Sequence, residues 1–262
     1  AVSSSTRSVT RRTRASISAW SSLPGRLIAS VPSSRPSVGR TTSRAFTVPL
    51  LVARGLLDEA MEALNPDVPF EKSADLQERP YYQISKGTLL LSQGKYGETL
   101  ALGREALEAR SSLGPVCPAV REGFVIGAEA ALALDDLEAV DALLAVPEGF
   151  GQSDLTPSWR GQVDRLTARL ASERGELDRV EPKFKAAAAY FQEINTPYWL
   201  AVTLAEHAEW LFGQDRVNEA EPLLAEARAI FERLKARPWL ERLRSFEDSP
   251  TAATGRRTAE AT

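Results

Sequence analysis

A six-residue hinge pattern recurs five times along this chain, and it restricts the fold more than any other feature of the sequence. The copies read GLLDEA, GKYGET, LDDLEA, GELDRV and DRVNEA, and they begin at residues 55, 94, 134, 175 and 215. Their spacing is therefore 39 to 41 residues. A period of this length is typical of arrays in which helix pairs stack and cover each other's apolar faces. Such arrays more often form binding surfaces than active sites.

Helical periodicity on both sides of the hinges indicates the secondary structure. In the second copy, the residues that share a helix face before or after the hinge are Tyr82, Ser85, Leu89, Leu100, Gly103, Ala106 and Leu107. The last copy repeats the pattern after its hinge, at Leu223, Leu224, Ala227, Ile230, Phe231 and Leu234. No segment shows the sustained alternation of a β-strand. The sequence therefore predicts an all-α fold, in which each repeat is a helix A, a hinge and a helix B.

Small residues recur in the middle of the predicted A helices. Gly87 and Gly127 lie 40 residues apart, and we align Ala168 and Ala208 with them in the next two repeats. A glycine inside a helix costs about 1 kcal/mol relative to alanine, so its repeated use suggests a packing reason. We predict that Gly87 and Gly127 lie where helix A closely approaches its own helix B.

Four of the five tryptophans fall in predicted helices, and these are Trp159, Trp199, Trp210 and Trp239. Packing in the core explains them more simply than a cage for a ligand. Trp239 follows Pro238, which favours the start of a helix over residues 238–247. We expect this helix to cover the exposed end of the array, because such arrays need end caps.

Residues 1–45 have a composition unlike that of the repeats. They contain thirteen Ser and eight Arg with little aliphatic content, and such segments bury too little apolar surface to become ordered. A disordered tail, an organellar transit peptide and a frameshift artefact in a GC-rich gene all fit. A basic RNA-binding arm fits less well, because Trp20 is its single tryptophan and no aromatic residues alternate with the arginines for base stacking. We favour the artefact, because the segment ends in the middle of a repeat. We expect the repeat domain over residues 46–247 and a second disordered tail over residues 248–262.

The charge distribution excludes some classes of partner. Residues 1–57 carry nine Arg and no acidic side chain, whereas the rest carries 23 basic and 35 acidic side chains, a net charge of −12. We therefore expect the folded body not to bind nucleic acid, since phosphates select basic surfaces. No stretch approaches the roughly 20 apolar residues of a membrane span. The single cysteine fits a reducing compartment, so we predict a cytoplasmic location. Because the sequence begins with Ala, we expect a fragment or a processed chain.

We find no set of residues typical of catalysis, of a cofactor site or of a metal site. His207 is the only histidine, and a lone histidine between Leu204 and Leu211 fits helix packing or capping better than metal binding. Cys117 has no His or Lys nearby in the sequence that would activate it, so we expect an ordinary thiol. A G-x-x-x-x-G-K-[ST] phosphate loop is also missing from the sequence. We therefore predict no enzymatic activity and no cofactor for this chain.

The inner face of the predicted A helices is the candidate binding surface. In the fourth repeat this face carries Arg165 and Arg169, and we take Arg121 and Glu209 to be at matching places in the repeats before and after it. These four residues are the candidate groove contacts, and the arginines would hold a carboxylate of a partner. The other interpretation, which we slightly favour, is a solvated face with the arginines paired to Glu173.

The spacing of small and hinge residues resembles the tetratricopeptide repeat. A small residue, about eleven further positions, the pattern G-x-hydrophobic-x-E-A and a second small residue seven positions on are typical of it, and a period near 40 resembles its longer variant in large bacterial signalling proteins. Residues 197–206, 219–228 and 230–242 are similar to the C-terminal helical-repeat region of bacterial class III adenylate/guanylate cyclases fused to a STAND-type ATPase. Related regions occur in large ATP-dependent transcriptional regulators.

This resemblance covers residues 55–247 and implies a right-handed α-solenoid that is a module of a larger signalling protein. We predict a non-catalytic protein-interaction or regulatory module, whose partners are other domains of the parent protein or another protein. Two alternatives stay open. One is a sensor array that binds a small ligand or a peptide in its concave groove, and the other is a part of a nucleotide cyclase whose catalytic domain is not in this chain.

Overall fold

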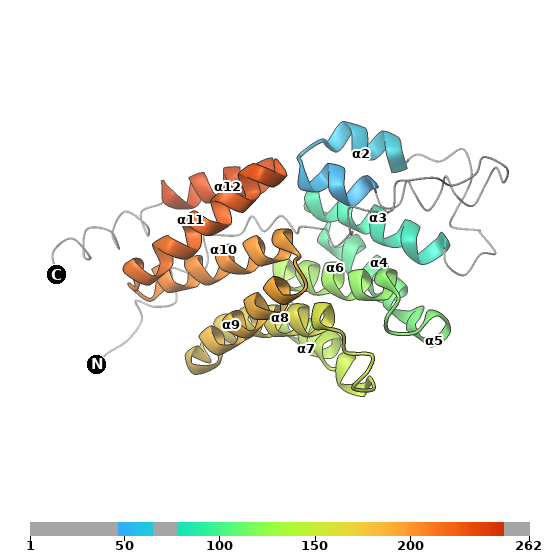
Figure 1. Ribbon diagram of the computed structural model, residues 1–262. Coiled ribbons are helices and arrows are strands. Elements are labelled where there is room, and N and C mark those ends of the chain that lie inside the picture. The colour runs from blue at the N-terminus through green and yellow to red at the C-terminus, as the bar shows by residue number, and fades with distance from the viewer. Residues whose placement is uncertain (1–46, 65–77, 249–262) are drawn as a thin grey trace. The chain divides into compact units, whose positions relative to one another are not determined.

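The structure, a computed structural model, describes residues 47–64 and 78–248 (Figure 1). Within these residues every regular element is a helix, which confirms the all-α prediction. The predicted disordered tails, residues 1–45 and 248–262, lie outside the described residues apart from Asp248. The chain divides into two compact parts after Trp159. We call residues 47–159 the N-terminal body and residues 160–248 the C-terminal body.

The N-terminal body consists of helix pairs joined by hinges. Its described helices are residues 47–53, α2 (Leu57–Leu64), α3 (Glu78–Ser92), α4 (Tyr96–Glu108), α5 (Arg110–Leu113), α6 (Pro118–Leu134), α7 (Leu137–Leu144) and the 3-10 helix η2 (Pro147–Gly149). α3 packs on α4 and α6, α4 packs along α6, and α6 packs on α7. Ile84, Leu100, Phe124 and Val140 are buried between these helices. Each of the pairs α3–α4 and α6–α7 is thus one helix A and one helix B, as predicted.

The C-terminal body contains two further pairs and a terminal helix. Its helices are α8 (Pro157–Arg174, which begins just before the division), α9 (Leu177–Glu193), α10 (Pro197–Gly213), α11 (Val217–Leu234) and α12 (Arg237–Glu247). α10 packs on both α9 and α11, and α12 packs on α11. The predicted terminal helix is therefore confirmed. Its Trp239 is buried, stacks on Phe231 at 5.2 Å between ring centroids, and donates its indole N–H to the Tyr198 hydroxyl at 2.8 Å.

All five hinges have the same backbone geometry. The residue at the centre of each has a positive φ between 59° and 76°, and these residues are Gly55, Gly94, Asp135, Gly175 and Asp215. In each hinge the following residue donates its backbone N–H to the carbonyl oxygen five residues earlier, at 2.9 to 3.0 Å. This is the Schellman motif that ends many helices. The five copies of the hinge sequence therefore share one backbone conformation.

The third hinge lies one residue later than the sequence suggested. Leu134 is the last residue of α6, and Asp135 has the positive φ. Counting back seven residues from the centres of the second to fifth hinges gives Gly87, Ala128, Ala168 and Ala208. Gly127 was therefore aligned one position too early. Aspartate tolerates the left-handed conformation better than most residues, and Asp135 replaces the hinge glycine here. Without a glycine to mark the hinge centre, the sequence alignment of this repeat was off by one residue.

Glycines do allow close helix contacts, but the prediction for Gly87 is wrong in its partner: an added Cβ atom there would lie 2.6 Å from Ile126 Cδ1 of the next helix A and 3.7 Å from Leu102 of its own helix B. The close contacts between backbones join helix B of one repeat to helix A of the next. A Cβ atom on Gly103 of α4 would lie 2.8 Å from both the Cα and the N atom of Gly127 in α6. A Cβ atom on Gly123 would lie 2.7 Å from the Cβ atom of Ala106. These distances leave no room for a methyl group, so α4 and α6 touch backbone to backbone.

Gly127→Leu is expected to lower the free energy of unfolding by about 1 to 3 kcal/mol through overpacking. An added Cβ atom would have ordinary contacts, 3.4 Å from Leu143 Cδ1 and 3.8 Å from Gly103 Cα, but the longer leucine would need the space that Leu143 occupies. Urea unfolding followed by circular dichroism measures the effect, with Gly127→Ala as the milder control. An unchanged midpoint for Gly127→Leu would show that Leu143 can move aside without cost.

Gly175→Ala is expected to destabilise the chain by about 1 kcal/mol, because an L-residue is strained at the positive φ of 73°. Steric contact does not contribute, since no heavy atom lies within 4 Å of an added Cβ atom. Gly213→Ala is the matched control: it also has 4 Å of free space, but it lies in α10 without a positive φ. Thermal unfolding of both variants isolates the backbone effect, and equal melting temperatures would contradict it.

Candidate functional site

Arg165 is placed inside the C-terminal body and not at an open surface. Its side chain is 0% exposed and contacts Glu206 of α10, with Nη1 at 2.9 Å from Oε1 and 3.0 Å from Oε2. Its Nε donates to Gln162 at 3.1 Å, and its guanidinium lies 4.9 Å from the ring centroid of Trp199. Both interpretations of this residue made from the sequence are therefore corrected. Arg165 is neither a free groove contact nor part of a solvated face paired to Glu173.

The neighbouring candidates are also paired across helices. Arg169 Nη1 lies 3.3 Å from Glu206 Oε1 and keeps a side-chain exposure of 18%. Glu209 accepts two hydrogen bonds from Arg242 of α12, at 2.9 and 2.6 Å. Burial opposes the charge of Arg242, yet Glu209 outweighs this and raises the pKa of the guanidinium above its usual value. These ion pairs join α8 to α10 and α10 to α12, so the charged residues of the A-helix face link helices within the C-terminal body.

Arg121 does not occupy the position that the sequence alignment assigned to it. Glu122, and not Arg121, lies thirteen residues before the hinge centre, as Gln162 does in the next repeat. Arg121 donates to Glu122 through Nε and Nη2, at 3.2 and 2.8 Å. It also belongs to the N-terminal body, whereas Arg165 and Arg169 belong to the C-terminal body. The structure therefore does not define the predicted patch of three arginines.

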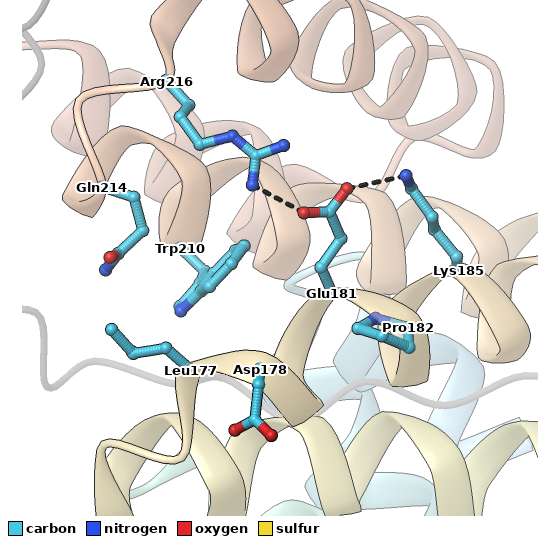
Figure 2. A pocket seen from close by; sticks show the side chains of 8 residues that line it. All are labelled: Leu177, Asp178, Glu181, Pro182, Lys185, Trp210, Gln214 and Arg216. Carbon is cyan, nitrogen blue, oxygen red and sulfur yellow. Dashed lines mark hydrogen bonds and ion pairs between the residues drawn. The ribbon is translucent and has the colours of Figure 1, made fainter.

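A pocket of about 630 Å³ lies at the hinge edge of the C-terminal body (Figure 2), and none of the predicted groove residues lines it. It is formed by the first turns of α9 and by the end of α10 with the hinge that follows. Its lining residues are Leu177, Asp178, Glu181, Pro182, Lys185, Trp210, Gln214 and Arg216. No local sequence pattern marks this edge, because its residues come from two repeats.

An ion-pair network closes one side of the pocket. Glu181 lies 2.6 Å from Arg216 and 2.6 Å from Lys185, as the dashed lines in Figure 2 show. Hydrogen bonds from Arg216 and then Lys185 lower the pKa of Glu181 to about 2. Arg216 also donates to both carboxylate oxygens of Glu219 and lowers its pKa. All four charges of this network are therefore compensated within the protein.

The lone histidine lies in the core beside this pocket. His207 is 5% exposed, stacks on Phe184 at 5.3 Å and lies 6.1 Å from the Trp210 ring. Its Nε2 atom has no hydrogen-bond partner among the described residues. Burial lowers the pKa of His207 to about 4. A neutral imidazole in an aromatic stack agrees with the packing role expected from the sequence.

Because the pKa of His207 is about 4 in the folded chain and 6.5 without its surroundings, the unfolded chain binds one more proton between these values. We therefore expect the free energy of unfolding to fall as the pH drops from 6.5 towards 4. His207→Leu should remove this slope, most clearly between pH 6.5 and 5, where carboxylates titrate little. Urea unfolding at several pH values measures it. The same slope in both proteins would assign the pH dependence to other groups.

Cys117 lies next to a tyrosine at the start of α6. It immediately precedes Pro118, is half-buried, and forms a side-chain hydrogen bond with Tyr81. Burial and then the Cys117 thiol raise the pKa of Tyr81 to about 12. Tyr81 is therefore a neutral phenol at pH 7, and no general base among the described contacts would activate the thiol. That Cys117 is an ordinary thiol stays a prediction.

Three buried tryptophans carry a periodic signal that the sequence interpretation did not use. Trp159, Trp199 and Trp239 lie 40 residues apart, and each is in the first turn of its helix, α8, α10 or α12. Their exposed fractions are 1%, 1% and 2%. A proline one or two residues earlier accompanies each of them. α12 therefore takes the place of helix A of a further repeat, and is not an unrelated cap.

Two other kinds of feature, a metal-binding cluster and a membrane-spanning helix, are absent from the described parts of the chain. No group of three or more His, Cys, Asp or Glu side chains in residues 47–64 and 78–248 is placed to hold a metal ion. None of the helices described here combines the length and the apolar character needed to cross a bilayer. In comparisons with known proteins, no family model matches the sequence, and no curated protein matches it.

Proposed function

We propose that this chain is a non-catalytic protein-interaction or regulatory module, built as a right-handed tetratricopeptide-like α-solenoid. The observation that carries the proposal is the Schellman hinge, which recurs with the same hydrogen bond at spacings of 39, 41, 40 and 40 residues. Identical hinges orient successive helix pairs alike, so that like faces of the pairs recur along an array. Proteins of this kind use the extended surface to hold a partner.

The partner we propose is another domain of a larger bacterial signalling protein, or a separate protein in the cytoplasm. The acidic composition of residues 58–262 argues against nucleic acid as the partner of the folded body. The ion pairs Arg165–Glu206 and Arg242–Glu209 are internal, so we place the contact surface away from them. Membership of a nucleotide cyclase remains a proposal that rests on the sequence resemblance.

A second candidate function, a sensor that binds a small ligand or a peptide, is favoured by one observation. The pocket at the hinge edge brings apolar and polar side chains together in about 630 Å³. This volume is in the usual range of ligand pockets. The sensor would then bind its ligand in this pocket, and not in the concave groove that the sequence analysis expected.

The interaction proposal is tested with a display library of genomic fragments from the source organism, selected on the immobilised chain. We expect reproducible enrichment of fragments that then bind the purified, folded chain in calorimetry. The heat-unfolded chain and an inert protein of equal net charge are the controls. If no fragment binds the folded chain better than these controls, the module proposal is wrong.

A further inference from the structure

The first described helix, residues 47–53, exposes a leucine at a position that the next two repeats bury. Leu50 lies five residues before the hinge centre Gly55 and is 40% exposed. Leu89 and Ala130, at the same position of the next two repeats, are 6% and 0% exposed. Because the position within the repeat is the same, the difference must come from what packs against it.

In later repeats this position packs on helix B of the repeat before. Leu89 of α3 lies in one buried apolar cluster with Ala60 of α2, which is five residues after the first hinge centre. Trp210 of α10 packs on the cluster that contains Val180 of α9, which is five residues after the fourth hinge centre. The residue five places before one hinge centre thus meets the residue five places after the preceding one.

A second pair of positions extends this contact by one helical turn. Gly127 of α6 and His207 of α10 both lie eight residues before a hinge centre. Gly127 approaches Gly103 of α4, and His207 stacks on Phe184 of α9 at 5.3 Å between ring centroids. Gly103 and Phe184 are each nine residues after the preceding hinge centre. The two contacts run in opposite directions along the two helices, so helix B covers one face of the next helix A in an antiparallel orientation.

The corresponding face of the first described helix is exposed. It carries Thr47 and Leu50, eight and five residues before Gly55, and both are exposed. In the described part of the chain, no helix B precedes residues 47–53 to cover them. We call Thr47 and Leu50 the docking face. It continues the interface that α2 forms with α3 and that α9 forms with α10.

The B helices of this chain indicate which residues fit such a face. Five places after the hinge centre, all of them have a small or β-branched residue that is buried: Ala60, Thr99, Val140, Val180 and Ala220. Four places further on they have an apolar residue or glycine: Leu64, Gly103, Leu144, Phe184 and Leu224. A helix that fits the docking face should present the same two positions.

We propose that the docking face binds an amphipathic helix of a partner domain, which presents Ala, Val or Thr and, four residues later, an apolar residue or glycine. This helix runs antiparallel to residues 47–53, with its small residue against Leu50. Binding removes the apolar surface of Leu50 from water, as the preceding helix B does for Leu89. The inference rests on the proposed interaction function and names the surface and the kind of partner.

A labelled peptide with the sequence of α11, Val217–Leu234, is the probe. It carries Ala220 and Leu224, the residue types that α2 presents at Ala60 and Leu64. Its 18 residues exceed the length of about 12 to 15 below which isolated helices are marginal. Fluorescence anisotropy with the full chain measures the affinity, and we expect saturable binding.

Two variants of the chain and two of the peptide locate the contact. Leu50→Asp should weaken binding about tenfold or more, because it removes a buried leucine side chain from the contact. Leu134→Asp is the matched control, since Leu134 is 45% exposed elsewhere in the N-terminal body, and should leave the affinity unchanged. In the peptide, Ala220→Arg should weaken binding about tenfold or more, whereas Ala225→Arg, at a position exposed in α11, should not.

Several results would overturn the docking face. These are a peptide that does not bind saturably, equal affinities of Leu50→Asp and Leu134→Asp, or equal affinities of the two arginine peptides. Analytical ultracentrifugation tests the other occupant, a second copy of this chain. A dimer that Leu50→Asp converts to a monomer would assign the face to that copy and would overturn the proposal for a partner domain.

The outcomes also distinguish the docking face from the proposed function. If genomic fragments bind the folded chain but Leu50→Asp weakens neither them nor the peptide, the module proposal stands and the docking face is wrong. If the α11 peptide binds at Leu50 but no genomic fragment binds the chain, the docking face stands and the module proposal is wrong.

Discussion

Arg165→Ala is expected to lower the free energy of unfolding by about 3 to 5 kcal/mol, the range found when one partner of a buried ion pair is removed. The variant leaves Glu206, itself 6% exposed, without its two bonds from Arg165 at 2.9 and 3.0 Å. Arg169 compensates in part, since it lies 3.3 Å from the same carboxylate. Urea unfolding followed by circular dichroism measures the loss.

The matched control for Arg165→Ala is an arginine in an exposed ion pair. Arg179 pairs with Glu176 and keeps a side-chain exposure of 54%, so Arg179→Ala should cost less than about 1 kcal/mol. The double variant Arg165→Leu/Glu206→Leu should recover part of the loss, because an apolar pair leaves no buried charge unpaired. Equal effects of Arg165→Ala and Arg179→Ala would show that Arg165 is solvated in solution.

Gly103→Leu is expected to be the most disruptive of the glycine substitutions, with a loss of about 3 kcal/mol or more, at the upper end of overpacking effects. The first added atom would already lie 2.8 Å from the backbone of α6, at Gly127 and at the carbonyl oxygen of Gly123. A backbone cannot rotate aside as a side chain can. Relief therefore requires α4 and α6 to move apart, which also uncovers the apolar side chains between them.

Gly97→Ala in the same helix should have the opposite effect. No heavy atom lies within 4 Å of an added Cβ atom at Gly97, and the residue is exposed in the first turn of α4. Alanine favours the helix over glycine by up to about 1 kcal/mol, so a small gain is expected. If the folded chain does not accumulate for Gly103→Leu, Gly103→Ala provides a milder measurement. A Gly103→Ala variant as stable as the parent chain would contradict the close approach of α4 and α6.

The tertiary structure pairs the charged residues of the predicted groove with partners on other helices. Arg165, Arg169 and Glu209 have the polar character and the spacing of an exposed helix stripe, and nothing local distinguishes them from solvated residues. Glu206 and Arg242, their partners, lie on other helices. The pocket was missed for the same reason, because Leu177 and Trp210 meet only after α9 and α10 have packed. Because the third hinge was placed one residue too early, the sequence alignment matched Arg121, and not Glu122, to Gln162 of the next repeat.

The amino-acid sequence by itself determined the helical class, the 40-residue period, the positions of the five hinges to within one residue and the terminal helix at Trp239. These features depend on local preferences: apolar spacing along one helix, and residues that tolerate a positive φ at its end. Only the tertiary structure decided which polar residues are buried, which glycines touch and where a pocket opens. Those depend on side chains about 40 residues away along the chain, such as Arg165 and Glu206, and on the packing of one repeat against the next.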